Sequence, residues 1–440
     1  MLFSLSKINR HPKGLAVLFF TELWERFSYY GMRAILVLYL ISDFNDKNPG
    51  LGWSNREAIM LYGWYTALVY LACIPGGIIG DRYITRKNSV IYGGFLLCGG
   101  HFTLAFQNEL FFFIGLILII LGVGLLKPNI STLVGHLYKI NDLRRDQGFT
   151  IFYIGINVGA FLASIIVGYV GEVFGWHYGF SLAGFGMLLG QISFLIGKKN
   201  ITEVSKKNSS KNTFSFKMKK QLSSIELDRV KLILISSLIL VIFWASFEQA
   251  GGLLNIFAYE KTNRYLSFLN IEIPASWFQS INPLLIIVLG YSVSVFWMYL
   301  KKRGMLATSI FKISIGIIIM GLGFIFMIFA SIESEIYGKS SMYWLFLAYL
   351  FFTIGELCAS PVILSYITKL SPEKLTASIM GIYFATIGLG NKLAGVIGQY
   401  SQALGEKLIF TGITLICVFV GGLVIMLHKR LIKLSHGVDD

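Results

Sequence analysis

One stretch decides how this chain folds: Thr21-Glu22-Leu23-Trp24-Glu25-Arg26-Phe27-Ser28-Tyr29-Tyr30-Gly31-Met32-Arg33. It lies inside an apolar run, from about Leu15 to Ile41, that is long enough to span a bilayer. A charged side chain at the middle of a lipid-facing helix costs roughly 2.5–3.5 kcal/mol. The two carboxylates and two guanidiniums recur at helical spacing, so they share one helix face. We therefore predict that this face lies against other helices or water, not lipid.

The composition is typical of a membrane protein with many spans. Of the 440 residues, 55% are hydrophobic and 14% are charged, and the mean hydropathy is +0.68. The net charge of +15 is explained by basic cytoplasmic loops, and no motif that reads DNA or RNA accompanies it. The cysteines lie in apolar runs without CxxC spacing, so neither disulfides nor a metal site are expected at Cys73, Cys98, Cys358 and Cys417.

Twelve apolar segments follow one another along the chain. They cover roughly 14–42, 54–80, 88–107, 110–136, 147–171, 177–197, 229–258, 276–300, 307–331, 342–370, 374–402 and 407–431. The segment between the sixth and seventh is rich in Lys, Ser and Asn and has no apolar run of spanning length. We predict an all-α membrane protein with an N-terminal six-helix bundle (1–197), a basic cytoplasmic linker (198–228) and a C-terminal six-helix bundle (229–440).

The loop charges predict the orientation. With both termini on one side, most loop Lys and Arg fall on that side, as in Lys301-Lys302-Arg303. Because positive loops stay in the cytoplasm, both termini are predicted to be cytoplasmic. The N-terminus lacks the features of a cleaved signal peptide, so the first span is expected to remain. We expect a multi-pass protein of the plasma membrane, the inner membrane in a bacterium.

The loop after the second span indicates the fold. It reads Gly76-Gly77-Ile78-Ile79-Gly80-Asp81-Arg82-Tyr83-Ile84-Thr85-Arg86-Lys87 and resembles the corresponding loop of major facilitator transporters. A weaker counterpart, Lys301-Lys302-Arg303-Gly304, follows the eighth span. Two six-helix halves related by an axis along the membrane normal are typical of that superfamily. The predicted fold is therefore the major facilitator fold with twelve transmembrane helices.

Among the ionisable residues within the other predicted spans, three are candidate functional residues: Lys127, Glu248 and Glu356. Such residues mark functional sites, because burying an unpaired charge in the membrane is costly. Basic groups of the first half thus face acidic groups of the second half. A transporter whose halves rock against each other can use such pairs as gates that break and re-form.

Several motifs together resemble the proton-dependent oligopeptide transporters. The opening stretch matches the family signature ExxERFxYYG, and Phe149-Thr150-Ile151-Phe152-Tyr153-Ile154-Gly155-Ile156-Asn157-Val158-Gly159-Ala160-Phe161 resembles a second signature. The remaining matches are Gly124-x-x-Lys127-Pro128-Asn129, Phe243-Trp244-x-x-Phe247-Glu248-Gln249, Gln279-Ser280-x-Asn282-Pro283 and Gly355-Glu356-x-x-x-Ser360-Pro361. They extend from the first span to the eleventh.

This resemblance implies a proton-coupled symporter that imports di- and tripeptides by alternating access. It implies that Arg26, Arg33 and Lys127 engage the peptide carboxylate, which a guanidinium binds bidentately, and that Glu356 faces the peptide amine. It also implies a cavity lined by aromatic rings and backbone-binding amides. The full set of implied substrate-binding residues is Arg26, Tyr29, Tyr30, Arg33, Tyr70, Lys127, Asn157, Trp244, Asn282, Glu356 and Tyr383.

The resemblance also implies two gates, Arg33 with Glu248 and Lys127 with Glu356, and proton coupling through Glu22, Glu25, Arg26 and Glu248. A carboxyl group that alternates between burial and contact with Arg takes up and releases a proton. Two roles remain open for Glu22 and Glu25: they carry protons, or they hold Arg26 and Lys127 in place. Protons are the coupling ion, no cofactor or metal is expected, and the protein is expected to act as a monomer in the bilayer.

Two alternatives remain open. On the same scaffold, the substrate is nitrate, another small anion or a drug, and Tyr383 in place of the family's usual Trp leaves the substrate range open. In a different class, Gly179-Phe180-Ser181-Leu182 weakly resembles a rhomboid-type protease motif, but no histidine at matching depth accompanies it. No HExxH or P-loop motif occurs in the sequence, so we predict a transporter and not an enzyme.

Overall fold

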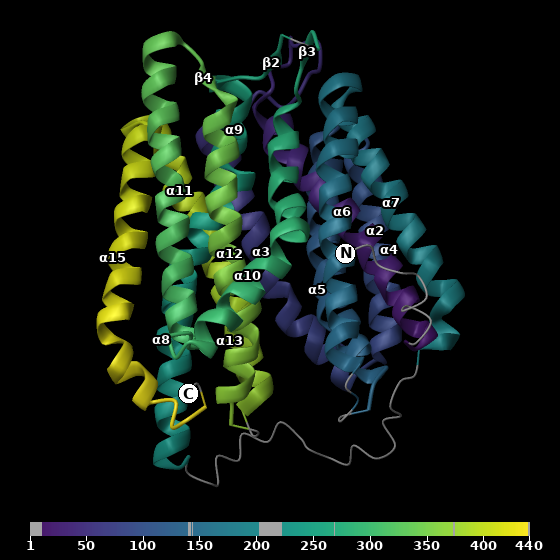
Figure 1. The fold of residues 1–440 in the computed structure, drawn as a ribbon. Helices are drawn as coiled ribbons and strands as arrows, with labels where there is room; N and C mark the ends of the chain where they lie inside the picture. Colours follow the sequence, from purple (N-terminus) through teal and green to yellow (C-terminus); the bar gives the residue numbers. More distant parts are fainter. Residues whose placement is uncertain are drawn as a thin grey trace.

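The protein is a bundle of long helices with short strands at one end (Figure 1). A computed structural model describes residues 11–139, 142, 144–201, 222–267, 269–372 and 375–438. Two pairs of two-residue strands form, β1 (Thr262–Asn263) with β4 (Ser340–Ser341) and β2 (Tyr265–Leu266) with β3 (Ile271–Glu272). We call the end that carries these strands the strand end. The opposite end, at which α7 ends and α8 begins, is the linker end.

The first half of the chain forms six long helices. They are α2 (Lys13–Ile41), α3 (Asn55–Arg82), α4 (Arg86–Leu104), α5 (Glu109–His136), α6 (Arg144–Phe174) and α7 (Trp176–Gly197), with η1 (Lys198–Asn200) after them. Helix α2 lies at the centre of this half and packs along α6 and α7. Most of its residues are buried, including all four of its charged side chains beyond Lys13.

The second half forms the remaining elements. They are α8 (Ser224–Phe247), η3 (Glu248–Gly251), α9 (Leu253–Lys261), η4 (Ala275–Ser280), α10 (Ile281–Lys302), α11 (Ser309–Tyr337), α12 (Met342–Leu370), α13 (Thr376–Gln399), α14 (Ser401–Leu404) and α15 (Glu406–Lys433). Most of the predicted linker, residues 202–221, lies outside the described part of the chain. Helix α8 begins at Ser224, a few residues before the predicted start of the seventh span.

The seventh and eighth predicted spans are not single regular helices. The seventh is divided into α8, the 3₁₀ turn η3 and α9, and the break contains Gly251 and Gly252, which disfavour a continuous helix. The eighth begins with the 3₁₀ segment η4 directly after Pro274, whose fixed φ and missing N–H suit a helix start. An apolar run in the sequence does not record such interruptions.

Ten of the helical segments in the described residues are long and apolar enough to cross a membrane. The other two long helices are α2, which carries the buried charges, and α4, whose first turn is Arg-Lys-Asn. Both pack within the bundle, α2 along α6 and α7, and α4 along α5. Every predicted span therefore corresponds to one helix or to one interrupted helix, and the all-α membrane fold is confirmed.

Polar caps mark where many of these helices begin. Ser54 accepts a hydrogen bond from the backbone N–H of Glu57, and the Glu57 carboxylate accepts one from the Ser54 N–H. Ser223 and Glu226 form the same capping box at the start of α8. The first N–H groups of a helix have no partner within the helix, so these side chains stabilise the first turns of α3 and α8.

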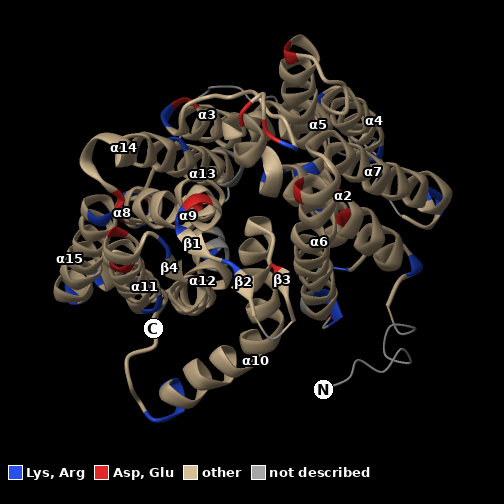
Figure 2. Cartoon of the chain, turned by 90° about the horizontal axis from the view of Figure 1, so that it is seen from above, with Lys and Arg blue, Asp and Glu red and all other residues tan. Residues whose placement is uncertain are grey.

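The two halves touch most closely where α3 crosses α13 (Figure 2). A Cβ atom added at Gly63 would lie 2.7 Å from the Gly395 Cα, so only glycine fits at this crossing. Toward the start of α13, the distance between the two helices increases. A Cβ at Gly388 would lie 3.1 Å from the Ala67 carbonyl oxygen, and one at Gly381 would lie 3.9 Å from Ile74. Helices α3 and α13 thus diverge toward the linker end.

A glycine-to-alanine pair tests the helix packing. A Cβ at Gly76 of α3 would lie 1.9 Å from the Gly124 carbonyl oxygen of α5, whereas nothing lies within 4 Å of a Cβ at Gly422 of α15. We expect Gly76→Ala to cost about 1–3 kcal/mol through forced separation of the two backbones. Gly422→Ala should unfold no earlier than the parent. Thermal unfolding of the detergent-solubilised proteins measures both, and equal midpoints would contradict this packing.

Candidate functional site

The charged residues of α2 form a compact buried cluster around Arg26. Its Nε lies 3.2 Å from Glu22 Oε1, and its Nη2 donates a hydrogen bond of 2.7 Å to Glu25 Oε1. The three side chains are at most 3% exposed. One guanidinium therefore pairs with two carboxylates away from lipid, and removing it would leave both buried without this cation. The rings of Tyr29 and Tyr30 lie 5.3 and 5.8 Å from the guanidinium carbon.

Two turns further along α2, Arg33 pairs with Glu248 of η3 in the other half. Arg33 Nη2 lies 3.2 Å from Glu248 Oε2, and Nη1 lies 3.4 Å from Oε1. Tyr62 of α3 donates a hydrogen bond of 3.1 Å to the same carboxylate. All three side chains are buried. The two halves are thus joined by a buried ion pair, and losing one partner of such a pair typically costs about 3–5 kcal/mol.

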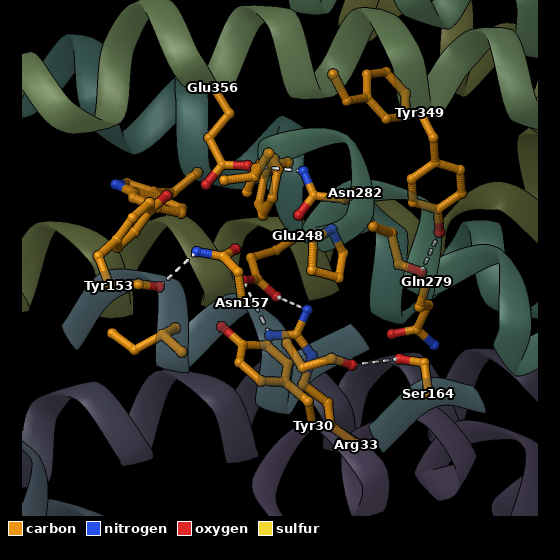
Figure 3. A pocket seen from close by; sticks show the side chains of 18 of the residues that line it. Tyr30, Arg33, Tyr153, Asn157, Ser164, Glu248, Gln279, Asn282, Tyr349 and Glu356 are labelled. Atoms are coloured by element: carbon orange, nitrogen blue, oxygen red, sulfur yellow. Dashed lines mark hydrogen bonds and ion pairs between the residues drawn. The ribbon is translucent and has the colours of Figure 1, made fainter. Parts of the chain in front are cut away.

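A cavity lies between the halves next to this ion pair (Figure 3). The volume of the cavity that is open to the centre of a water molecule is about 130 Å³. The predicted residues that line it are Tyr30, Arg33, Tyr70, Asn157, Trp244, Glu248, Asn282 and Glu356, and the other lining residues are Tyr153, Ile156, Ala160, Ser164, Phe247, Ala250, Gln279, Pro283, Ile286, Tyr349 and Phe352.

The acidic wall of the cavity is built on α12. Glu356 projects from α12 into the cavity, and Arg33 projects into it from the opposite side (Figure 3). Its Oε2 accepts a hydrogen bond of 2.8 Å from the Asn282 amide, which also donates to Thr353 at 3.1 Å. No ion pair to Glu356 occurs within the described residues, so its carboxylate faces the cavity without a cation. On α6, Asn157 donates to the Tyr153 carbonyl and leaves its side-chain oxygen for other donors.

Several predicted site residues do not line the cavity: Glu22, Glu25, Arg26, Tyr29, Lys127 and Tyr383. Lys127 Nζ lies 4.0 Å from the centre of the Tyr70 ring, and Tyr70 lines the cavity. The Lys127–Glu356 pair implied by the resemblance is not formed among the described residues. Tyr383 of α13 is half-buried, and its ring lies 5.8 Å from that of Phe384. The structure thus brings together only one of the two implied pairs.

Some residues of the site were not predicted. Tyr62, the hydrogen-bond donor to Glu248, lies about two helical turns before Tyr70 in α3, and that spacing is a signal that could have identified it. Tyr153 and Tyr349 also line the cavity, but their sequence contexts resemble those of many aromatic residues in spans. Gln279 lines it because η4, which no hydropathy pattern predicts, places that side chain there.

Polar contacts between the halves gather at the strand end. The Asn255 amide of α9 donates to the Ala34 carbonyl of α2 at 2.8 Å, and the Asn55 amide of α3 donates to Glu260 of α9 at 3.0 Å. The Arg33–Glu248 pair lies on the same side of the molecule, because Arg33 is next to Ala34 in α2. The described structure is therefore closed at the strand end, where a substrate would have to break these bonds to pass.

The arrangement suits a transporter of small molecules that carry charge. A cavity midway through a membrane bundle has a cation on one wall and an acid on the other, between two halves joined by breakable polar contacts. In the described residues, no group of three or more His, Cys, Asp or Glu side chains could hold a metal ion. Fold and site define a membrane transporter built from two helical bundles.

Comparison with known proteins gives the family. The family model of the POT family matches residues 87–225 and 199–408. An uncharacterised transporter of Bacillus subtilis is 37% identical over 97% of this chain and 96% of the relative, and a peptide transporter of Yersinia enterocolitica is 34% identical over 89% and 88%. A di-/tripeptide transporter of Lactococcus lactis is 32% identical over 97% of both chains.

Solved structures agree. The crystal structure of a peptide transporter in complex with sulfate has a TM-score of 0.87 and 34% identity and covers 96% of both chains. A POT family transporter in complex with 5-aminolevulinic acid has a TM-score of 0.86 and 30% identity over 96% and 97%. The chain belongs to the POT family, the proton-dependent oligopeptide transporters that its motifs resemble. These relatives are transporters and not enzymes, so the protease alternative no longer applies.

A double-mutant cycle tests the contact around Glu248. A Cβ at Gly251 would lie 1.9 Å from the Tyr62 hydroxyl oxygen, so Gly251→Ala should push that hydroxyl away and cost about 1–3 kcal/mol. Tyr62→Phe removes the oxygen that the new methyl group would meet. We therefore expect the double variant to lose less stability than the sum of the single variants. Thermal unfolding of the four proteins measures the coupling, and strictly additive losses would contradict the contact.

Proposed function

We propose that this protein is a proton-coupled symporter that imports di- and tripeptides by alternating access. The observation that carries the proposal is the position of Glu356, which faces the cavity opposite Arg33 and, in the described part of the chain, has no cation paired with it. A peptide is a zwitterion, with an amine at one end and a carboxylate at the other. A wall with an acid opposite a wall with a guanidinium matches both ends, whereas a simple anion has no use for the acid.

The residues take the following roles in this proposal. Arg33 meets the peptide carboxylate when it is not paired with Glu248, and Glu356 meets the amine. Asn157 and Asn282 lie on opposite sides of the cavity and bind the peptide backbone through their amides. Trp244 and Tyr30 supply apolar walls for side chains. Tyr383 is also assigned to the substrate site, although it does not line the cavity in this conformation.

Arg26 and Lys127 also belong to the proposed substrate site, although neither lines the cavity in this conformation. Lys127 lies against the Tyr70 ring, which lines the cavity, so a substrate that reaches Tyr70 comes close to the Lys127 ammonium group. Arg26 is held by its two carboxylates and reaches a substrate only through Tyr30 and Tyr29, which lie against it. Its nearer role is therefore to set the charge of the Glu22–Glu25 cluster that couples to protons.

Proton coupling is assigned to Glu22, Glu25 and Glu248. Glu248 is bound by Arg33 while the strand end is closed. Once the halves part it loses that cation, and a carboxylate that loses its cation in a buried site takes up a proton more readily. Protonated Glu248 would in turn release Arg33 for the peptide carboxylate. Proton uptake and peptide binding are thereby linked through one guanidinium.

The division of the chain and its orientation complete the proposal. Residues 1–197 and 229–440 act as the two moving bundles, joined by the basic segment 198–228. The strand end faces the outside and both termini face the cytoplasm, because loop Lys and Arg collect toward the linker end. Arg33 with Glu248 is then the outer gate. Lys127 with Glu356 is the inner gate, which closes when the outer gate opens.

Uptake by proteoliposomes tests the function directly. With an inward proton gradient, we expect the purified protein to accumulate dialanine above its external concentration. Collapse of the gradient with a protonophore should abolish accumulation. Nitrate and a cationic drug serve as comparison substrates on the same vesicles. If dialanine does not accumulate while one of them does, the peptide assignment is wrong.

Substitution of Glu248 tests the coupling. Glu248→Gln keeps the shape of the side chain but cannot bind or release a proton. We expect it to lower proton-driven dialanine accumulation at least tenfold while leaving exchange of dialanine between the two sides measurable. Glu335→Gln, an exposed carboxylate near the end of α11, is the matched control and should transport like the parent. Unchanged accumulation by Glu248→Gln would remove this residue from the proton path.

A further inference from the structure

A second buried carboxylate joins the halves at the strand end, and no part of the site described above uses it. Glu172 lies two residues before the end of α6, and its side chain is 8% exposed. It accepts hydrogen bonds from the backbone N–H groups of Ala275 and Ser276, both at 2.8 Å, and from the Ser276 hydroxyl at 2.5 Å. All three donors belong to η4, in the other half of the chain.

These bonds are of a strong kind. The N–H groups belong to the first residues of a helical segment that continues directly into α10, where backbone donors without a partner favour an anion. Arg264 adds a positive charge, with Nη1 at 3.8 Å from Glu172 Oε2. It is held there by the Ile273 carbonyl at 2.6 Å and by Glu272 at 2.9 Å. Burial strengthens charge-assisted hydrogen bonds of this type.

The face of α6 around Glu172 is shaped for this contact. One turn earlier, a Cβ at Gly168 would lie 2.2 Å from the Ser276 hydroxyl oxygen, so a side chain there would displace η4. One turn before that, the Ile165 carbonyl accepts a hydrogen bond of 3.0 Å from the Trp277 indole. Three successive turns of α6 thus bind the same six-residue segment of the other half.

The same two elements also form part of the cavity. The face of α6 that binds η4 continues to Ser164 and Asn157, which line the cavity, and η4 carries Gln279 and leads directly to Asn282. Figure 2 shows α6 beside α10, which follows η4. Movement of η4 away from α6 would therefore open the strand end and withdraw both amides from the cavity in one step.

We propose that Glu172 is a positioning residue of the transport cycle. Resting on the proposed function, this inference gives the strand end two closures that share no residue: Arg33–Glu248 joins α2 to η3, and Glu172 joins α6 to η4. The Glu172 closure holds Gln279 and Asn282 at the cavity while the strand end is shut, and it breaks when that end opens. Glu172 touches neither peptide nor proton acceptor, and it acts through η4.

Accessibility of the cavity tests this closure without any substrate. Ser164→Cys places a thiol on the cavity wall, and the four native cysteines are buried. The probe is a membrane-impermeant maleimide added outside right-side-out vesicles. We expect Glu172→Gln to raise the labelling rate of this thiol about tenfold, because the amide keeps the shape but loses the charge that binds the η4 donors. Glu57→Gln is the matched control, since Glu57 caps a helix at the same end within one half.

A second variant leaves Glu172 in place. Gly168→Ala should displace Ser276 and raise the labelling rate in the same direction. Gly412→Ala is its control, because nothing lies within 4 Å of a Cβ there. Labelling of both test variants at the rate of their controls would overturn the proposal. Thermal midpoints of all four proteins show that each is folded.

The positioning role has its own readout. If Glu172 acts through η4, its loss withdraws Asn282 from the peptide, so the half-saturating dialanine concentration should rise while the maximal rate falls. A purely structural role would lower the maximal rate alone, and that result would overturn the positioning role. Raised labelling in a protein that transports no dialanine would support the Glu172 closure and contradict the proposed function. Failure of the closure and failure of the proposed function therefore give different results.

Discussion

The structure depends on the cost of placing charges inside a membrane. Helix α2 carries Arg26 and Arg33 at depths where lipid cannot solvate them, so protein must surround the helix on every side. The fold meets this requirement by placing α2 at the centre, between α6 and α7 of its own half and against α9 and η3 of the other. Its two arginines then receive different partners. Arg26 is neutralised within its own helix, whereas Arg33 depends on a residue that arrives from the second half.

This difference separates a permanent element from a reversible one. The Glu22–Arg26–Glu25 cluster moves with one half and keeps its charges paired through any motion of the other. The Arg33–Glu248 pair exists only while the halves meet. Other polar contacts accompany it at the strand end, such as Asn255 with the Ala34 carbonyl. Water can replace hydrogen bonds of this kind one by one, whereas a large apolar interface would resist opening. These hydrogen bonds and this ion pair therefore suit two surfaces that must separate repeatedly.

Much of this arrangement could be predicted from the sequence. Apolar runs gave the helices, because hydropathy depends on local composition. The pairing of Arg33 with Glu248 followed from a family resemblance and not from spacing, since the two are far apart along the chain. The breaks at η3 and η4 were not predicted, because a hydropathy pattern carries no information about backbone geometry. Nor was the separation of Lys127 from Glu356, which depends on where the halves stand in this conformation. The Glu172 contact was missed because backbone N–H donors leave no signature in the side chains.

The crossing of Gly63 and Gly395 has a mechanical consequence. Two backbones in direct contact cannot be compressed, and no side chain there can rearrange to let them slide. This point therefore behaves as a pivot, and it lies in the part of α3 nearer the strand end. From Gly63 to the end of α3 at Arg82 the helix is roughly 28 Å long at 1.5 Å per residue. A rotation of about 10° at the pivot would move the far end by about 5 Å. Because the lever arm toward the strand end is the shorter one, the same rotation displaces that end less. A small set of hydrogen bonds and ion pairs there can then control a much larger opening on the opposite side of the membrane.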